Sequence, residues 1–225
     1  MTRSIATSFF LALASSTALA GNSLYLEQSG TDATINIEQM GDNNIIGTST
    51  TNASVLGSYT ILDITQLGMD NELALIIDGM TADVTLLQDG SFNAFNVDIG
   101  GYLGSDDVTL SLGVDGDYNT VNVTVGNTAS TSNATINMTV TGDYNTTDII
   151  ENGTSSSTSA KVTNVDIVGD TNTITVTKSG AGLQLFDLTH TGDSGTFTAT
   201  QSGAANNSAT VSTNGNNANI TVLQH

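Results

Sequence analysis

Hydrophobic and polar residues alternate with a period of two along most of the chain. Residues 121–125 (VNVTV) and 173–177 (TITVT) show this pattern most clearly. Successive side chains of a β-strand point to opposite sides, so the alternation is typical of strands that bury one face. No stretch keeps the period of about 3.6 residues that marks an amphipathic helix. β-Branched residues, which favour strands, are abundant. The pattern therefore predicts an all-β fold.

The alternating segments are separated by a recurring Gly-x-x-Asn tetrapeptide. Its glycine and asparagine stand at Gly41 and Asn44, Gly68 and Asn71, Gly90 and Asn93, Gly116 and Asn119, Gly142 and Asn145, and Gly169 and Asn172. Gly192 and Gly215 continue the series, and successive glycines lie 22 to 27 residues apart. Self-similarity at such a spacing predicts a stack of repeats and not a globule built around one site.

Each repeat contains two strand segments separated by corners, which corresponds to one coil of a β-solenoid. We expect about eight stacked two-strand coils with Gly and Asn at the corners, spaced about 4.8 Å apart. A single coil buries too few apolar side chains to offset the conformational entropy of its own backbone, so its stability must come from neighbouring coils. An alternative, in which Gly and Asn mark ordinary hairpin turns, stays open at this point.

The corner residues have two expected roles. Glycine provides positive φ without steric strain, and asparagine tolerates it better than most residues. In a stack, the side-chain amide of one asparagine can also hydrogen-bond the amide of the asparagine in the next coil, which forms a ladder.

The distance from each corner glycine predicts which side chains face the interior. Residues five, seven and nine places after the glycine are expected inward on one wall. Residues six, four and two places before the next glycine are expected inward on the other wall. Most of these residues are apolar, but the first set contains Glu151 and Lys178 and the second contains His190. The outward positions are mainly Thr, Asn, Ser and Asp.

The first 20 residues have the features of a secretory signal peptide. Arg3 precedes a short apolar segment over residues 5–14, and residues 18–20 (ALA) match a cleavage site. The apolar segment is too short for a transmembrane helix, and no later segment is long enough. We therefore expect residues 1–20 to be removed. Residues 21–225 are expected to form one exported solenoid domain with no membrane span after cleavage.

The processed chain is strongly acidic. Without Arg3 it keeps Lys161 and Lys178 against 22 acidic residues, a formal charge of 2 − 22 = −20. Such a surface repels nucleic acids and anionic membranes, so we expect no nucleic-acid partner. The chain also has no proline. Proline lacks the N–H group that a central strand needs, so its absence fits strands that are paired on both edges.

Both ends of the processed chain resemble strands. Residues 24–28 (LYLEQ) and 220–225 (ITVLQH) lie close to the two termini, and no capping segment is expected at either end. An uncapped solenoid edge offers unpaired backbone groups to another molecule. The sequence therefore predicts a solenoid able to stack end to end into a fibre.

Glutamine precedes four Gly-x-x-Asn corners, which gives Gln-x-Gly-x-x-Asn at Gln39, Gln66, Gln88 and Gln201. This arrangement resembles the curlin repeats of bacterial curli fibres, over most of residues 24–225. The resemblance implies a secreted functional-amyloid subunit at the cell surface, which polymerises with itself, builds biofilm matrix and supports adhesion. It also implies a nucleator subunit and an outer-membrane secretion channel as partners, and a ladder formed by the four glutamines. The equivalent positions of the middle repeats hold Val114, Val140 and Ile167.

Residues suited to catalysis or metal binding are scarce. The chain has no cysteine and only two histidines, His190 and His225, so we expect no nucleophile–base pair and no His/Cys metal cluster. Accordingly, we predict no enzyme activity, no cofactor and no metal site. The Gly-Asp corners have a faint similarity to calcium-binding repeats, which leaves calcium as an open alternative.

Two further functions stay open. A monomeric secreted β-solenoid could act as an adhesin, or it could bind ice through the Thr-x-Thr runs at 173–177 and 196–200. A β-helical enzyme of the pectate-lyase type would need basic residues beside carboxylates in a cleft, and residues 21–225 contain only two lysines.

Overall fold

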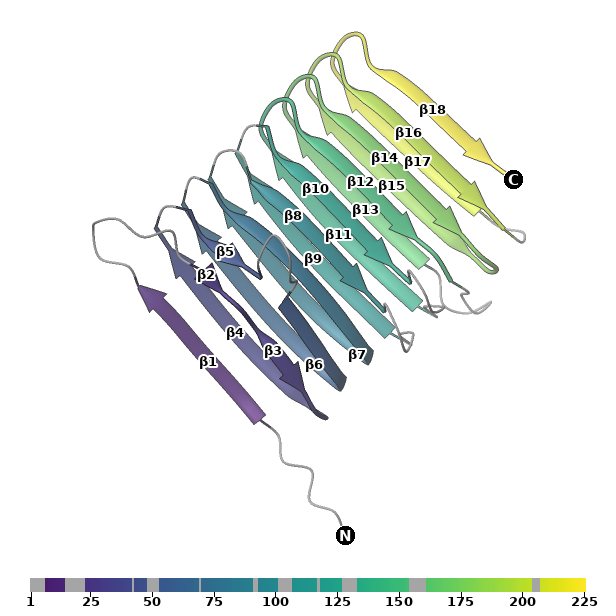
Figure 1. Ribbon diagram of the computed structural model, residues 1–225. Coiled ribbons are helices and arrows are strands. Elements are labelled where there is room, and N and C mark those ends of the chain that lie inside the picture. The colour runs from purple at the N-terminus through teal and green to yellow at the C-terminus, as the bar shows by residue number, and fades with distance from the viewer. Residues whose placement is uncertain are drawn as a thin grey trace.

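In the computed structural model, the chain winds into one stack of β-strands (Figure 1). The structure describes residues 7–14, 23–41, 43–47, 53–68, 70–90, 93–100, 107–116, 118–126, 133–153, 161–203 and 207–225. For residues 7–14, 79 and 80, it describes the backbone alone. Within these ranges, no helix that could span a membrane is found.

The strands follow one another in chain order along the stack. They are β1 (Thr7–Ala14), β2 (Ser23–Leu24), β3 (Glu27–Ser29), β4 (Ala33–Met40), β5 (Ile45–Ile46), β6 (Ala53–Leu67), β7 (Glu72–Asp89), β8 (Ala94–Ile99), β9 (Asp107–Asp115), β10 (Thr120–Val125), β11 (Asn133–Thr141), β12 (Thr146–Glu151), β13 (Lys161–Val168), β14 (Thr173–Ser179), β15 (Gln184–Thr191), β16 (Thr196–Ser202), β17 (Asn207–Asn214) and β18 (Asn219–Gln224).

The chain alternates between two walls of parallel strands. β10 pairs with β8 and β12, and β11 pairs with β9 and β13, so each of these strands skips its neighbour in sequence. The first wall contains β2, β3, β5, the starts of β6 and β7, and the even-numbered strands β8 to β18. The second wall contains β1, β4, the ends of β6 and β7, and the odd-numbered strands β9 to β17. This arrangement confirms the predicted all-β solenoid, and the described residues contain no helix.

The number of complete coils is smaller than predicted. The described residues form about six turns, against the expected eight. The shortfall lies mainly at the N-terminal end, where β2, β3 and β5 contain only two, three and two residues of the first wall. In the coil that contains β5, residues 47–52 come between Ile46 and Ala53, which pair with Leu73 and Leu75 of the next coil. The next coil has only Ala74 between its two paired residues, so the segment between Ile46 and Ala53 is longer than in a regular pass.

The core lies between the two walls and extends along the whole stack. Before the last coil, the inward positions predicted from the corner spacing are buried: Val121, Val123 and Val125 are 0%, 1% and 0% exposed. Along the ladder these residues lie beside Phe95, Val97 and Ile99 of the preceding coil, which are equally buried. The predicted register is therefore confirmed, since a slip of one residue would turn these side chains to solvent.

Part of the predicted signal peptide lies in the stack. Residues 1–6 and 15–20 lie outside the described residues, whereas β1 is parallel to β4 from Thr7 opposite Ala33 to Ala14 opposite Met40. β1 forms one end of the stack and β18 the other (Figure 1). Cleavage after Ala20 stays a prediction, and it would remove β1.

Candidate functional site

The corner glycines are required by the backbone conformation and by the stacking of coils. φ is 148° at Gly68 and 136° at Gly169. A Cβ atom at Gly68 would lie 1.7 Å from the carbonyl oxygen of Gly41, and one at Gly169 would lie 2.1 Å from that of Gly142. Any side chain there would push adjacent coils apart. The other predicted corner glycines, Gly41, Gly90, Gly116 and Gly142, also have positive φ.

In the corners that begin at Gly41, Gly116, Gly142 and Gly169, the third residue, and not the asparagine, has the left-handed backbone conformation. φ is 61° at Tyr118, 59° at Tyr144 and 59° at Thr171. The expectation that the corner asparagine itself adopts positive φ is therefore wrong for the described corners. This conformation is strained for bulky or β-branched residues. The rings of Tyr118 and Tyr144 stack with their centroids 5.1 Å apart, which adds a stabilising contact beside two strained positions.

The corner asparagines form a buried column along the stack. Oδ1 of Asn93, Asn119, Asn145 and Asn172 accepts a hydrogen bond from the backbone N–H of the asparagine one coil earlier, whereas Oδ1 of Asn71 has no partner among the described residues. These bonds join Asn71 to Asn93 (3.3 Å), Asn93 to Asn119 (2.9 Å), Asn119 to Asn145 (2.8 Å) and Asn145 to Asn172 (2.8 Å). The column therefore joins side chain to backbone, and the predicted bonding of one amide to the next amide is not observed.

The Nδ2 groups of the same asparagines close the corners. Asn172 donates to the carbonyl oxygen of Gly169 at 2.8 Å. Asn44 donates to Gly41 at 3.0 Å and also to Leu67 of the next coil at 2.9 Å. Each asparagine thus satisfies backbone groups that would otherwise be buried without a partner, which is costly in a dry interior.

Three of the four predicted ladder glutamines lie together. Gln66 donates to Gln39 at 2.8 Å, and Gln88 donates to Gln66 at 2.6 Å, inside the second wall. Gln201 is not part of this ladder, because it lies in β16 of the first wall. There it accepts a hydrogen bond of 2.7 Å from Gln224 of β18. The Gln-x-Gly-x-x-Asn pattern therefore occurs at corners where the chain leaves the second wall and also at a corner where it leaves the first wall.

A second column of polar residues lies outside the asparagines. The backbone N–H of Asp170 donates to Asp143 at 2.6 Å, that of Asp193 donates to Asp170, and that of Asn216 donates to Asp193 at 2.5 Å. These carboxylates therefore serve the backbone of the next coil. Among the described residues, no group of three or more acidic, histidine or cysteine residues is arranged to hold a metal ion.

A cluster of charged side chains, formed by Glu151, Lys161 and Lys178 with Thr163, lies in the core. Lys178 Nζ is 2.9 Å from Glu151 Oε2, and both side chains are fully buried. Thr163 donates to the same carboxylate oxygen at 2.8 Å. Lys178 also donates to the carbonyl oxygens of Lys161 at 2.9 Å and Leu185 at 2.7 Å. The pair thus joins β12 to β14 across one ladder step.

Burial lowers the pKa of Lys161 and Lys178 below the ordinary value, and the nearby Glu151 carboxylate opposes this change. Lys161 donates to the carbonyl oxygens of Gly153 at 3.1 Å and Ser179 at 2.5 Å. Both lysines of residues 21–225 are therefore in the interior, and this stretch offers no lysine or arginine side chain to solvent. The corner spacing had placed Glu151 and Lys178 at equivalent inward positions, and this signal could have revealed the pair.

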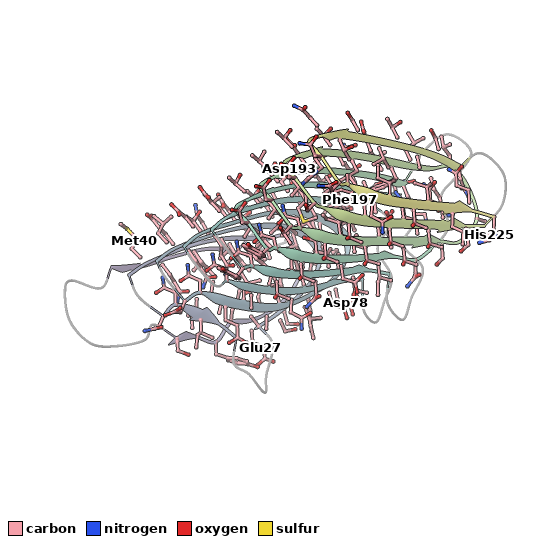
Figure 2. All side chains as sticks on the ribbon, turned by 90° about the horizontal axis from the view of Figure 1, so that it is seen from above. Glu27, Met40, Asp78, Asp193, Phe197 and His225 are labelled. Atoms are coloured by element: carbon pink, nitrogen blue, oxygen red, sulfur yellow. The ribbon has the colours of Figure 1, made fainter. Side chains whose placement is uncertain are left out.

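His190 is a core residue, as its inward position suggested. It is fully buried, its Nε2 lies 3.0 Å from the carbonyl oxygen of Gly169, and its ring packs against Phe197 with centroids 4.6 Å apart. His225, at the end of the described stack, donates through its backbone to Gln201 at 3.0 Å. Figure 2 shows Met40 and Glu27 toward one end of the stack and His225 toward the other.

The coil that contains β18 exposes its apolar residues. Ile220 and Val222 are 43% and 40% exposed, whereas Phe197 and Ala199, their ladder partners in β16, are 2% and 3% exposed. Ala209 and Val211 of β17 are only partly buried against the core. This end of the described stack therefore presents the cross-section of the core, together with the unpaired edges of two strands.

No family model, curated protein or solved structure matches this chain. The features that bear on function are the polar columns, the buried charge cluster and the two end faces.

Proposed function

We propose that this chain is a structural subunit of an extracellular, curli-like fibre, in which solenoids of about eight coils, partial end coils included, associate end to end. The single observation that carries the proposal is the exposure of Ile220 and Val222 at positions that are buried in every neighbouring coil. Covering such a side chain contributes about 1.5–3 kcal/mol. A second copy that continued the ladder would cover both and would also pair the strand edges.

The curlin-like Gln-x-Gly-x-x-Asn corners support the extracellular setting of this proposal, as does the apolar leader over residues 5–14. In that setting the fibre would belong to a biofilm matrix and support adhesion. A nucleator subunit and an outer-membrane channel would be its partners. Such a role requires no catalytic residue.

The charge distribution supports assembly that depends on salt. Because Lys161 and Lys178 are buried, copies meet as acidic surfaces that repel one another. Repulsion between exposed charges is screened over about 8–10 Å at physiological ionic strength. We expect the lag time of assembly to fall as salt is added, measured by thioflavin fluorescence of residues 21–225. A lag time indifferent to salt would contradict this part of the proposal.

Negative-stain microscopy of purified residues 21–225, together with thioflavin fluorescence, tests the fibre itself. The parent chain is expected to form unbranched fibres. Ile220→Asp places a charge on the exposed core face and is expected to prevent them. Thr221→Asp adds the same charge to the outward face of the same strand, and it is expected to leave fibres intact. A parent chain that stays monodisperse under these conditions would refute the proposal.

One observation favours ice binding as a second candidate. The outward threonines at 173, 175 and 177 of β14 lie in register with those at 196, 198 and 200 of β16. Ice binding needs such a regular array on many coils, and the neighbouring strand β12 has Asp148 and Ile150 at equivalent positions. Thermal hysteresis of the monomeric chain, measured with and without Thr175→Asp, would separate the two functions.

A further inference from the structure

The two end faces of the processed chain do not match as whole coils. Residues 23–29, at the N-terminal end, run along the first wall, and β18, at the C-terminal end, runs along the same wall. The stretch from 23 to 225 therefore makes one more pass along the first wall than along the second. Suppose that β18 simply paired with residues 23–29 of the next copy. A gap one strand wide would then remain in the second wall, between β17 of one copy and β4 of the other.

In the structure, that place on the second wall is filled by β1. It pairs in parallel with all eight residues of β4. Because β1 belongs to the predicted leader, the processed chain would leave this edge of β4 unpaired. The edge therefore accepts an eight-residue parallel strand in this register.

β17 has the length and the register to take this place. It contains eight residues, and the successive ladders of the second wall align Asn207 with Ala33. On β4 of a second copy, Ala209 and Val211 would then lie beside Ile35 and Ile37. In both strands these are apolar inward positions.

A buried amide on β4 gives independent support. Gln39 is fully buried, and its Nε2 has no hydrogen-bond partner among the described residues. Thr213 is the β17 residue at the same inward position of the wall. Its hydroxyl group can accept a hydrogen bond from Gln39 Nε2, whereas the aligned residue of β1, Leu13, has no acceptor in its side chain.

β18 and residues 23–29 carry the same inward pattern. Ile220, Val222 and Gln224 occupy the ladder positions that Leu24, Leu26 and Gln28 occupy at the other end. Residues 23–29 are held by strands of two and three residues, whereas β18 is a continuous strand of six. β18 is therefore able to replace residues 23–29 against β5 and β6.

We propose that copies of this chain associate by strand exchange. β17 of one copy takes the place of β1 on β4 of the next, and β18 displaces residues 23–29 from β5 and β6. The exchange rests on the proposed fibre function and specifies its interface. The exchange adds the pairing of β17, with eight residues, and of β18, with six. It gives up the pairing of β2 and β3, which have two and three residues. Residues 21–29 then form a free arm at each junction.

Cysteine cross-linking distinguishes exchange from simple stacking, because the chain has no cysteine of its own. Exchange places Leu223 beside Ser54 of the next copy, whereas simple stacking places it beside Glu27, the ladder partner of Ser54. Disulfides form only between Cα atoms within about 4.4–6.8 Å, so we expect Leu223→Cys with Ser54→Cys to cross-link roughly tenfold more than Leu223→Cys with Glu27→Cys. Non-reducing gels of the fibres give the yields.

The second wall offers a matched test. Exchange places Thr210 of β17 beside Asn36 of β4, since both are fourth in their strands. Thr210→Cys with Asn36→Cys is expected to cross-link, and Thr210→Cys with Thr139→Cys, in the middle of the stack, controls for random lateral contacts. Fibres that cross-link through Glu27 and not through Ser54 or Asn36 would overturn the exchange and leave the fibre function standing. Absence of fibres would overturn the function itself.

A kinetic measurement gives a second readout. Leu26→Asp weakens the attachment of residues 23–29, because the Leu26 side chain is buried in the core. Under exchange these residues must leave before docking, so the lag time of assembly is expected to shorten several-fold. A lag that is unchanged or longer would show that residues 23–29 belong to the interface, and would overturn the exchange.

Discussion

Val176 and Val222 are the same residue at the same inward position of one ladder, yet their surroundings differ. Val176 lies in β14, Val222 lies in β18, and Ala199 of β16 lies between them. Val176 is 1% exposed and Val222 is 40% exposed. Both valines end the same Ile-Thr-Val sequence, at 174–176 and at 220–222, so burial in this fold depends on whether a coil has neighbours on both sides. The middle of the stack therefore buries its apolar side chains, whereas the end of the described stack exposes them.

The largest expected effect comes from placing a charge at each of these two positions. Val176→Asp buries an unpaired carboxylate, which costs at least several kcal/mol and is expected to prevent folding of the middle coils. Val222→Asp is expected to leave the circular dichroism spectrum and the urea midpoint nearly unchanged, while fibres no longer form. If both variants unfold, or if Val222→Asp still polymerises, the distinction between middle and end fails.

A second prediction concerns the charge cluster in the middle coils. Glu151→Gln keeps the shape but leaves two buried lysines without an anion, and breaking such a pair costs about 3–5 kcal/mol. Glu151→Val with Lys178→Ile leaves one buried lysine without an anion instead of two, so it is expected to restore part of this stability, and Val and Ile occupy that ladder in other coils. Urea unfolding of the three chains measures the effect. A double variant less stable than the single one would show that the network itself is required.

A third prediction compares a middle corner with the last one. Asn145→Ala removes the acceptor for the buried N–H of Asn119, and an unsatisfied buried group costs about 1–3 kcal/mol. The last corner has Ala218 at this place, so Ala218→Asn is expected to offer an acceptor to the backbone N–H of Gly195, one coil earlier, and to stabilise by about 0.5–1.5 kcal/mol. Hydrogen exchange at Asn119 and Gly195 checks each change separately. Equal protection in the parent and the variants would show that the column contributes no stability.

The smallest expected effect is a dependence on pH. Burial lowers the pKa of Lys161 and Lys178 below 10.5 in the folded state, against the opposing effect of Glu151. Between the lowered pKa and 10.5, the unfolded chain binds more protons than the folded chain, so the free energy of unfolding rises with pH in that window. The free energy of unfolding of the Lys161→Met variant is expected to rise less steeply with pH, because one of the two buried lysines is removed. Urea midpoints measured at several pH values compare the two, and parallel curves would contradict the prediction.

Much of the fold could be predicted because its determinants are local. Alternation of apolar residues defines the strands, and a glycine whose Cβ would meet the coil below defines each corner, as at Gly169. The stacked coils then follow from the repeat. The candidate site was less predictable, because its bonds connect residues from different coils. Asn119 and Asn145 were placed correctly at the corners, but their bonds run from side chain to backbone.

The amino-acid sequence by itself determined the strand period, the corner residues and the inward side of each strand, since these depend on neighbours within a few residues. The tertiary structure decided which positions are buried and paired. Glu151 and Lys178 are 27 residues apart and meet only because one coil lies on the next in register. Gln201 has the same local motif as Gln39 but lies on the opposite wall, because the two kinds of corner are locally alike. At the end of the described stack the inward positions of β18 are still mostly apolar, but burial is lost because no described coil covers them.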